Sequence, residues 1–358
     1  MRKVYFTPGP SGLYFTVEHH IKHAIKSGVT SISHRSKQFE EIFREAETNL
    51  KTLLQLPDNY KMVFTSSATE IWEKMADNLI SNKSLHMVNG AFSKKFFTAV
   101  HNLNKEADII ESSWGDLPDF NTSTSESYDL IGVTHNETST GVRTPLDKLY
   151  SLKEQHPDSI VAVDAVSSLP VVDFDYSKID TVYASVQKAF GLPAGLGVWL
   201  INDKTEALAR KLYEQSNARQ SSHNVISLLD QAQKYQTPST PNILGIYLFS
   251  QVVGDMINRG IQQIRNDVIY KSAIMYNMLD QHDIIKPFVQ EKTLRSDTII
   301  VIDSGERTSD LKTYLSDHKL EVGNGYGKMM GKQIRIANFP THSKEQFEML
   351  VDLINKFE

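Results

Sequence analysis

The stretch TVYASVQKAFGLPAGLGVWLI, residues 181–201, contains one charged residue, Lys188, among apolar and small side chains. Its two runs TVYAS and LGVWLI are typical of buried strands on either side of a glycine-rich turn. A lysine almost never lies in such a stretch unless it is paired or takes part in chemistry. The alternative is a lysine whose stem packs while its ammonium group reaches water, and this stretch alone leaves both interpretations open.

Similar short apolar runs recur through the first two thirds of the chain and alternate with helical patterns. They are KMVFT, LIGVT and IVAVD. Between residues 39 and 54 the apolar side chains recur at helical spacing instead. This alternation predicts an α/β fold with a mostly parallel sheet between helices, in which ligands bind at the carboxyl ends of the strands.

The last hundred residues differ in character. They contain a long helical pattern around residues 254–282, the strand patterns DTIIVID and KQIRIANF, and a final helix that begins with a Ser343–Gln346 capping box. A chain of 358 residues also exceeds what a single core usually holds. We therefore predict a large domain of residues 16–250 and a smaller α+β domain formed by residues 1–15 and 251–358.

Composition narrows the classes of function. A net charge of −5 without a Lys/Arg-rich run argues against a nucleic-acid partner. No apolar stretch reaches membrane-spanning length and residues 1–11 lack the apolar core of a signal peptide, so we expect a cytoplasmic protein without membrane contact. The sequence has no cysteine, which excludes disulfides, thiolate metal sites and a cysteine nucleophile, and no metal site is predicted.

Asp164 ends the apolar run IVAVD and is followed by small residues. A carboxylate buried at a strand end needs a cationic partner. Lys188 follows about one strand–connection–strand unit later. Taken alone, Asp164 is explained equally well as a turn or helix-capping aspartate.

The segment FTSSATEIWEKMADNL passes from a strand into a helix, with Ser67 and Glu70 at capping-box spacing. The N–H groups of Ala68 and Thr69 would then point out of a helix N-terminus, where an anion such as phosphate binds. A capped helix start without a ligand fits the same pattern. A bound phosphate would also require the Glu70 carboxylate to turn back onto the cap.

The run LIGVT leads into a polar loop, HNETSTG, which in isolation is a plain turn. Together, Lys188, Asp164, the helix start and this polar loop are more informative than any one of them. Pyridoxal 5'-phosphate (PLP) requires such features in combination. It needs an amine of lowered pKa to bond its aldehyde, a carboxylate to keep its pyridine nitrogen protonated, and a helix N-terminus for its phosphate. We therefore predict that PLP is bound through Lys188.

The motifs TPGPS, SHRS, HNETSTG, VDAVSS, QKAFGLPAGLG and RIANFPTHS make the chain resemble the class V, fold-type I aminotransferases over nearly its whole length. The resemblance implies a seven-stranded, mostly parallel sheet in the large domain, PLP-dependent amino transfer and a homodimer with both sites at the interface. Within the class, the motifs are most similar to the phosphoserine aminotransferases of serine biosynthesis.

The resemblance implies a role for each matched residue. Lys188 matches the Schiff-base lysine and Asp164 the partner of the pyridinium nitrogen. The other matched cofactor positions are Ala68 and Thr69 at the phosphate, Phe92 stacked on the ring, Thr138 at the ring oxygen, and Gln187 beside the lysine. Gln236 and Thr237 match the segment that the second subunit contributes to the cofactor phosphate.

On the substrate side, His34, Arg35 and Arg335 match positions that bind the phosphate and carboxylate of the substrate, and Lys328 is a further candidate cation. Glu70 departs from the family pattern, which usually has arginine there. The stretch GNGYGKMMGKQIRIAN is more similar to alanine–glyoxylate or serine–pyruvate aminotransferases.

Two reactions therefore stay open. The first is amino transfer from glutamate to 3-phosphohydroxypyruvate, giving phosphoserine and 2-oxoglutarate, and the alternative is amino transfer between alanine or serine and glyoxylate. A class V desulfurase would need a cysteine nucleophile, which the chain lacks. A PLP-binding relic without activity should have lost Lys188 or Asp164, and both are present.

Overall fold

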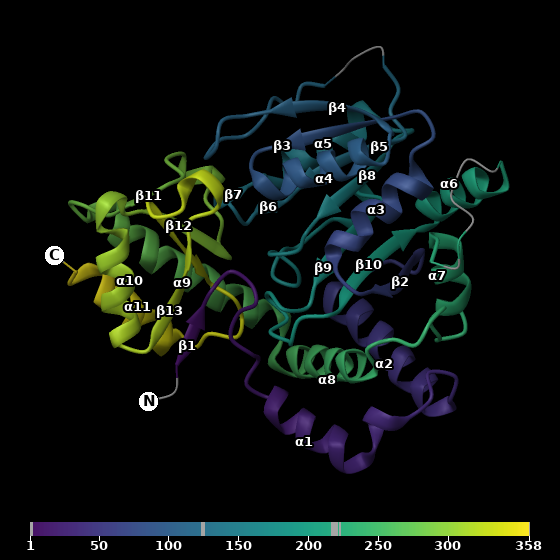
Figure 1. Cartoon of the computed structure of the whole chain (residues 1–358), viewed down its shortest axis with the longest axis horizontal. Coiled ribbons are helices and arrows are strands. Elements are labelled where there is room, and N and C mark those ends of the chain that lie inside the picture. The colour runs from purple at the N-terminus through teal and green to yellow at the C-terminus, as the bar shows by residue number, and fades with distance from the viewer. Residues whose placement is uncertain (1–2, 123–125, 216–220, 222, 358) are drawn as a thin grey trace.

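The structure is a computed structural model that describes residues 3–122, 126–215, 221 and 223–357. Two sheets with their own helical layers lie side by side (Figure 1). The larger sheet carries the middle of the chain, and the smaller sheet joins the N-terminal strand to the C-terminal part. Within the described residues, no helix has the length and apolar character needed to cross a bilayer.

The larger sheet has seven strands and confirms the predicted α/β fold. In spatial order the strands are β2 (Tyr60–Thr65), β10 (Gly197–Asn202), β9 (Thr181–Ser185), β8 (Ile160–Asp164), β5 (Leu130–Thr134), β3 (Lys83–Val88) and β4 (Glu106–Glu111). Strand β10 is antiparallel to both neighbours, and the other pairs are parallel. The five strands expected from the apolar runs are confirmed, whereas β3 and β4 lay outside those runs.

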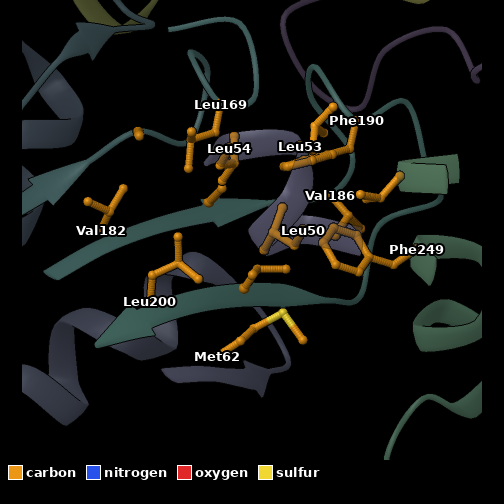
Figure 2. Close-up of a cluster of buried hydrophobic side chains, with 14 of the residues drawn as sticks. Leu50, Leu53, Leu54, Met62, Leu169, Val182, Val186, Phe190, Leu200 and Phe249 are labelled. Carbon is orange, nitrogen blue, oxygen red and sulfur yellow. The ribbon is translucent and has the colours of Figure 1, made fainter. Parts of the chain in front are cut away.

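Helices cover both faces of this sheet. The first layer contains α1 (Val17–Ser27), α2 (Lys37–Leu54), α5 (Leu146–Gln155) and α8 (Ile243–Arg259), and the second contains α3 (Ala68–Leu79), α4 (Ala91–Asn102), α6 (Asp203–Glu214) and α7 (Val225–Ala232). Because successive side chains of a strand point to opposite faces, Val182 and Leu200 pack with the first layer (Figure 2), while Tyr183 and Trp199 pack with the second. The sheet is therefore buried on both sides.

The smaller sheet has five strands. They are β1 (Val4–Phe6), β13 (Leu320–Asn324), β14 (Gln333–Ala337), β12 (Ile299–Asp303) and β11 (Lys286–Pro287), flanked by α9 (Ile261–Gln281), α10 (Thr308–Asp317) and α11 (Lys344–Asn355). The pair β1–β13 is parallel and the others are antiparallel. Strands β6 (Asn136–Glu137) and β7 (Val142–Arg143) form a separate short pair beside the larger sheet. Short 3₁₀ turns occupy Val29–Ser31, Tyr176–Lys178, Lys292–Leu294, Gly305–Arg307 and Gly327–Met329.

Of the features predicted for the last hundred residues, the structure confirms the capping box and divides the long helix in two. The capping box of α11 is confirmed, since the Gln346 amide donates to Ser343 Oγ at 3.2 Å and the Ser343 amide donates to Gln346 Oε1 at 3.1 Å. The long helical pattern is interrupted at Gly260, whose φ of 86° ends α8 and starts α9. Helix α8 crosses residue 250 and packs on α2, so the division into domains at residues 15 and 250 stays a prediction.

Candidate active site

The predicted lysine and aspartate meet at the carboxyl edge of the larger sheet. Asp164 is the last residue of β8, where it is in register with Thr134 of β5 and Tyr183 of β9. Lys188 lies three residues beyond the end of β9. Parallel neighbours with helical connections bring strand ends together at one edge, which is where such sheets place their ligands.

Lys188 is enclosed and does not reach bulk water. The residue is 9% exposed, its Nζ donates to the carbonyl oxygen of Pro8 at 2.6 Å, and its Nζ lies 5.8 Å from the centre of the Phe92 ring. Gly9 has a φ of 145°, and a Cβ at this position would lie 2.5 Å from the lysine Nζ. The N-terminal segment therefore closes over the amine, which excludes the interpretation as a solvent-reaching surface lysine.

The environment of Lys188 favours its neutral form. Burial, followed by the charge of Arg335, lowers its pKa to about 8, while the carboxylates of Asp164 and Glu137 act in the opposite direction. About a tenth of the amine is therefore neutral at pH 7. Nucleophilic attack on an aldehyde requires that neutral form.

Asp164 is a buried carboxyl group, with 5% of the residue exposed. Burial raises its pKa to about 7 and the charge of Glu137 acts in the same direction, while the Val166 amide, Tyr183 and Lys188 oppose the rise. The amide bond, 2.9 Å from Val166 N to Oδ1, is also the contact expected of a turn aspartate. These groups together do not offset the effect of burial, so the carboxyl group suits a cationic ligand group.

The start of α3 lies beside this pair and differs from the expected capping box. Ser67 Oγ accepts the Glu70 amide at 3.3 Å, but the Glu70 carboxylate bonds to the amide and hydroxyl of Ser66 at 2.8 and 2.6 Å instead of the Ser67 amide. An ion pair with Lys74 at 3.0 Å also holds it. The Ala68 amide donates to Ser185 Oγ at 3.1 Å.

Glu70 remains ionised at this helix start. Burial alone would raise its pKa, but the hydrogen bonds from Ser66 and Lys74 lower it overall. A cavity of about 440 Å³ lies here, and Ser66, Glu70 and Thr237 are among the residues that line it. One chain by itself thus brings the predicted phosphate-side residue Thr237 to the start of α3.

The loop HNETSTG is organised by Glu137, a residue that the sequence did not single out. Glu137 is fully buried, and its carboxylate accepts the amides of Phe92 and Ser93 at the start of α4, at 3.1 and 2.9 Å, and the Ser139 amide at 3.0 Å. A carboxylate is favourable at a helix N-terminus. These bonds hold Phe92 near Lys188 and place buried Thr138 next to the loop carboxylate.

Arg335 is the predicted substrate cation that lies near Lys188. Its Nε donates to the Asn324 carbonyl at 2.7 Å, and one terminal nitrogen donates to the Thr138 carbonyl at 3.2 Å. Its guanidinium lies 5.2 Å from the ring centre of Tyr326. Burial lowers the pKa of Arg335, and its charge in turn contributes to the lowered pKa of Lys188.

Two lysines lie near Tyr326 or Trp114, and only one of them, Lys328, was predicted from the sequence. Lys328 is exposed and its Nζ lies 5.1 Å from the Trp114 ring centre. Lys95, which was not predicted, donates to the Tyr326 hydroxyl at 2.6 Å and lies 5.4 Å from the Phe92 ring centre. Lys95 stands three residues after Phe92 on α4, a spacing that places both on one helix face and was the signal available in the sequence.

Arg35 and Gln236 form a second group. Arg35 donates to Gln236 Oε1 at 2.6 Å and to the Pro238 carbonyl at 3.3 Å. The neighbouring imidazole of His34 has a pKa lowered by partial burial and then by the charge of Arg35. These contacts join Arg35 to Gln236 and not to Lys188 or Arg335. Gln187 is half-buried, and its carbonyl accepts the Ser11 amide at 3.2 Å.

The match to a known family covers the whole larger sheet and part of the smaller one. Residues 7–331 match the family model of aminotransferase class-V. The chain belongs to the class V aminotransferases. Members of this family use PLP, so this aminotransferase is a PLP-dependent enzyme that acts on amino-acid and 2-oxo-acid substrates.

Individual relatives agree with the family. The aminotransferase is 26% identical over 338 residues to a phosphoserine aminotransferase of Rhodococcus opacus, covering 92% of this chain and 89% of the relative. A crystal structure of a phosphoserine aminotransferase from Cytophaga hutchinsonii is 42% identical, with a TM-score of 0.96 and coverage of 99% and 98%. The alanine–glyoxylate aminotransferase of Nostoc, at 20% identity, a TM-score of 0.84 and coverage of 99% and 95%, shares the fold.

The residues present fit PLP. The cofactor needs an amine that loses its proton readily, an anion opposite its ring nitrogen and an aromatic surface. The aminotransferase places buried Lys188 and Asp164 together, with the partly buried Phe92 beside the amine. The raised pKa of Asp164 indicates that the free site lacks sufficient positive charge. A pyridinium nitrogen is a cation of the kind that this carboxylate lacks.

Proposed function

We propose that this aminotransferase is a phosphoserine aminotransferase, which transfers an amino group from glutamate to 3-phosphohydroxypyruvate in serine biosynthesis. The observation that carries the proposal is the 42% identity over 99% of the chain to the Cytophaga hutchinsonii phosphoserine aminotransferase. Curated phosphoserine aminotransferases at 26–28% identity over about nine tenths of the chain support it.

We assign the cofactor roles to residues of the buried group. PLP, when bound, supplies an electron-withdrawing ring next to the substrate α-carbon. Lys188 Nζ would hold the cofactor aldehyde and, once the substrate amine has displaced it, would be free to take and return the α-proton, for which a pKa of about 8 is well matched to neutral pH. Asp164 would keep the pyridine nitrogen protonated, and Phe92 would pack against the ring.

The phosphate and ring-oxygen contacts of PLP fall to other elements. Ala68 and Thr69 lie at the start of α3, where amide groups and the helix dipole favour an anion. The amide of Ala68 already has Ser185 as a partner, so Ser185 would move or share when phosphate binds. Thr138 and Gln187 flank the ring and the lysine, respectively.

We assign the substrate α-carboxylate to Arg335. Its guanidinium is fixed by two backbone carbonyls and partly buried, which leaves N–H groups in a rigid plane for a two-bond contact with a carboxylate. The phosphate of the substrate needs further cations. His34 and Arg35 are the predicted ones, and the structure adds Lys95, whereas Lys328 lies over Trp114.

Steady-state kinetics test the proposed substrate. We expect a higher kcat/KM for phosphoserine with 2-oxoglutarate than for alanine or serine with glyoxylate. The glyoxylate reaction is the second candidate, because an ionised Glu70 lines the cavity at the start of α3 and disfavours a second phosphate nearby. A higher kcat/KM for a glyoxylate pair would replace the proposed substrate and leave the fold, family and cofactor unchanged.

Lys95→Met should lower kcat/KM for phosphoserine by about tenfold, because a charge-assisted hydrogen bond to phosphate contributes ~1.5 kcal/mol or more. The Tyr326 hydroxyl holds Lys95 on the side of the site where Arg335 contacts the same ring. Lys328→Met is the matched control and should remain within about twofold of the wild-type enzyme. The reverse order of effects would assign the phosphate to Lys328.

We further propose a homodimer in which Gln236 and Thr237 reach the cofactor phosphate of the other subunit. A Thr237→Glu subunit should be inactive because its carboxylate repels phosphate, and a Lys188→Ala subunit should be inactive because it lacks the amine. Heterodimers of the two should regain up to half of wild-type activity, since one site combines an intact Lys188 with an intact Thr237. If Thr237 acts within its own chain, purified heterodimers will stay inactive.

A further inference from the structure

A hydrogen-bonded pair of buried aromatic residues lies beside Asp164 in the sheet. Tyr183 on β9 is in register with Asp164 on β8, so both side chains lie on the face of the sheet that α3 covers. The indole Nε1–H of Trp72, on α3, donates to the Tyr183 hydroxyl oxygen at 2.7 Å. Trp72 is 4% exposed and Tyr183 is 0% exposed, so water does not compete for this bond.

The direction of the hydrogen bonds in this group is fixed by chemistry. An indole N–H only donates, so Tyr183 accepts from Trp72 and keeps its own proton for another acceptor. Asp164, the in-register neighbour of Tyr183 on β8, is the acceptor that we assign, and Tyr183 is among the groups that oppose the burial-driven rise of the Asp164 pKa. Burial and then the Asp164 charge raise the pKa of Tyr183 itself, so the phenol stays protonated and remains a donor.

We propose that Trp72 and Tyr183 are positioning residues, which hold the Asp164 carboxylate ionised and oriented for the pyridine nitrogen of PLP. The inference rests on the proposed role of Asp164. It adds that the carboxylate receives its support from the face of the sheet that α3 covers, through Tyr183 and its partner Trp72.

The same helix would then support both ends of PLP. Ala68 and Thr69, proposed to bind the phosphate, form the first turn of α3, and Trp72 lies one turn further along. A shift of α3 along its axis would therefore change the phosphate contacts and the Trp72–Tyr183 bond together. Retention of the cofactor should depend on this coupling.

The test is the dissociation constant of PLP from the holoenzyme between pH 6 and 9. Tyr183→Phe keeps the ring and removes the donor, so the Asp164 pKa should rise and the carboxyl stay protonated to higher pH. We expect PLP to dissociate about tenfold more readily at pH 8, with the pH dependence displaced upward. Trp72→Phe should change PLP dissociation in the same direction but by a smaller factor.

Matched controls separate this effect from a loss of packing. Tyr60→Phe removes a buried hydroxyl bonded to the Ile179 carbonyl at 2.6 Å, and Trp199→Phe removes a buried indole bonded to Thr181 Oγ1 at 2.6 Å. Neither control should displace the pH dependence of PLP binding. The inference is overturned if Tyr183→Phe behaves as wild type, or if Tyr60→Phe gives the same displacement.

A double-mutant cycle distinguishes failure of the inference from failure of the role of Asp164. In an Asp164→Asn background, Tyr183→Phe should cause no further loss of PLP, because its effect is transmitted through the carboxylate. Equal losses in both backgrounds would show that Tyr183 acts independently and would overturn the inference. If Asp164→Asn itself retains PLP and turnover as in the wild type, the proposed role of Asp164 is wrong, whatever the effect of Tyr183→Phe.

Discussion

Lys188→Ala should carry no covalently bound PLP and should lose turnover by at least about a thousandfold, since covalent catalysis and proton transfer are removed together. The amine is the buried, partly neutral group that faces Phe92 and Pro8. Borohydride reduction followed by peptide mass analysis should locate the cofactor on Lys188 in the wild-type enzyme. The same treatment should label no active-site peptide in the variant.

Lys271 provides the matched control for this experiment. It is a second buried lysine, and burial lowers its pKa to about 7, so its amine is also available near neutral pH. Its Nζ, however, donates to the carbonyls of Phe339 and His342 at 3.0 and 2.9 Å in the smaller sheet region. Cofactor found on Lys271, or retained in Lys188→Ala, would contradict the assignment.

Asp164→Asn should lower turnover by several factors of ten, each equal to ~1.4 kcal/mol of barrier. Asparagine has nearly the same shape but no charge, so the pyridine nitrogen would no longer be held protonated and the ring would withdraw electrons less strongly. Single-turnover rates with saturating PLP measure this loss apart from cofactor release. Rates near the wild-type value would show that turnover does not depend on the Asp164 carboxylate and would contradict its proposed role.

The same variant should remove a loss of stability that the wild-type apoenzyme undergoes as pH rises. Burial raises the Asp164 pKa from 3.8 to about 7, so between these values the folded protein keeps a proton that the unfolded chain releases. The free energy of unfolding therefore falls as pH rises, by ~1.4 kcal/mol per pH unit and on the order of 4 kcal/mol in all.

Asp164→Asn abolishes this loss. The apo variant should be more stable than the wild-type apoenzyme at pH 8 and nearly equal to it near pH 4, as measured by urea unfolding at both pH values. A wild-type apoenzyme that is the more stable one at pH 8 would show that the buried carboxylate already has a sufficient partner without PLP.

Local patterns predicted the strands that are buried on both faces. Strands β5, β8 and β9 are wholly buried, and double burial produces continuous apolar runs that can be read without knowledge of the neighbours. Strand β3 was not predicted because buried polar residues interrupt its apolar run: His86 lies within it, with Ser84 Oγ 3.1 Å from the His86 Nε2. Strand β4 escaped because it lies at the sheet edge and is only half-buried.

Within the site, the sequence by itself determined the residues that stand out from their own surroundings. Lys188 and Asp164 are charges in apolar stretches, and desolvation makes such placements costly unless they have a use. Together with the motifs, this was sufficient for the fold, the family and the cofactor. It left open which cations face the substrate.

Only the tertiary structure decided the partners of those residues. Glu137 under α4, Tyr183 and Trp72 beside Asp164, and Lys95 at Tyr326 lie in ordinary local patterns, and their importance comes from contacts between distant segments. The closure of Pro8 over Lys188 joins residues 180 positions apart. Hydrogen bonds and charge interactions act over a few ångströms of space, so their partners follow from the packed chain and not from spacing along the sequence.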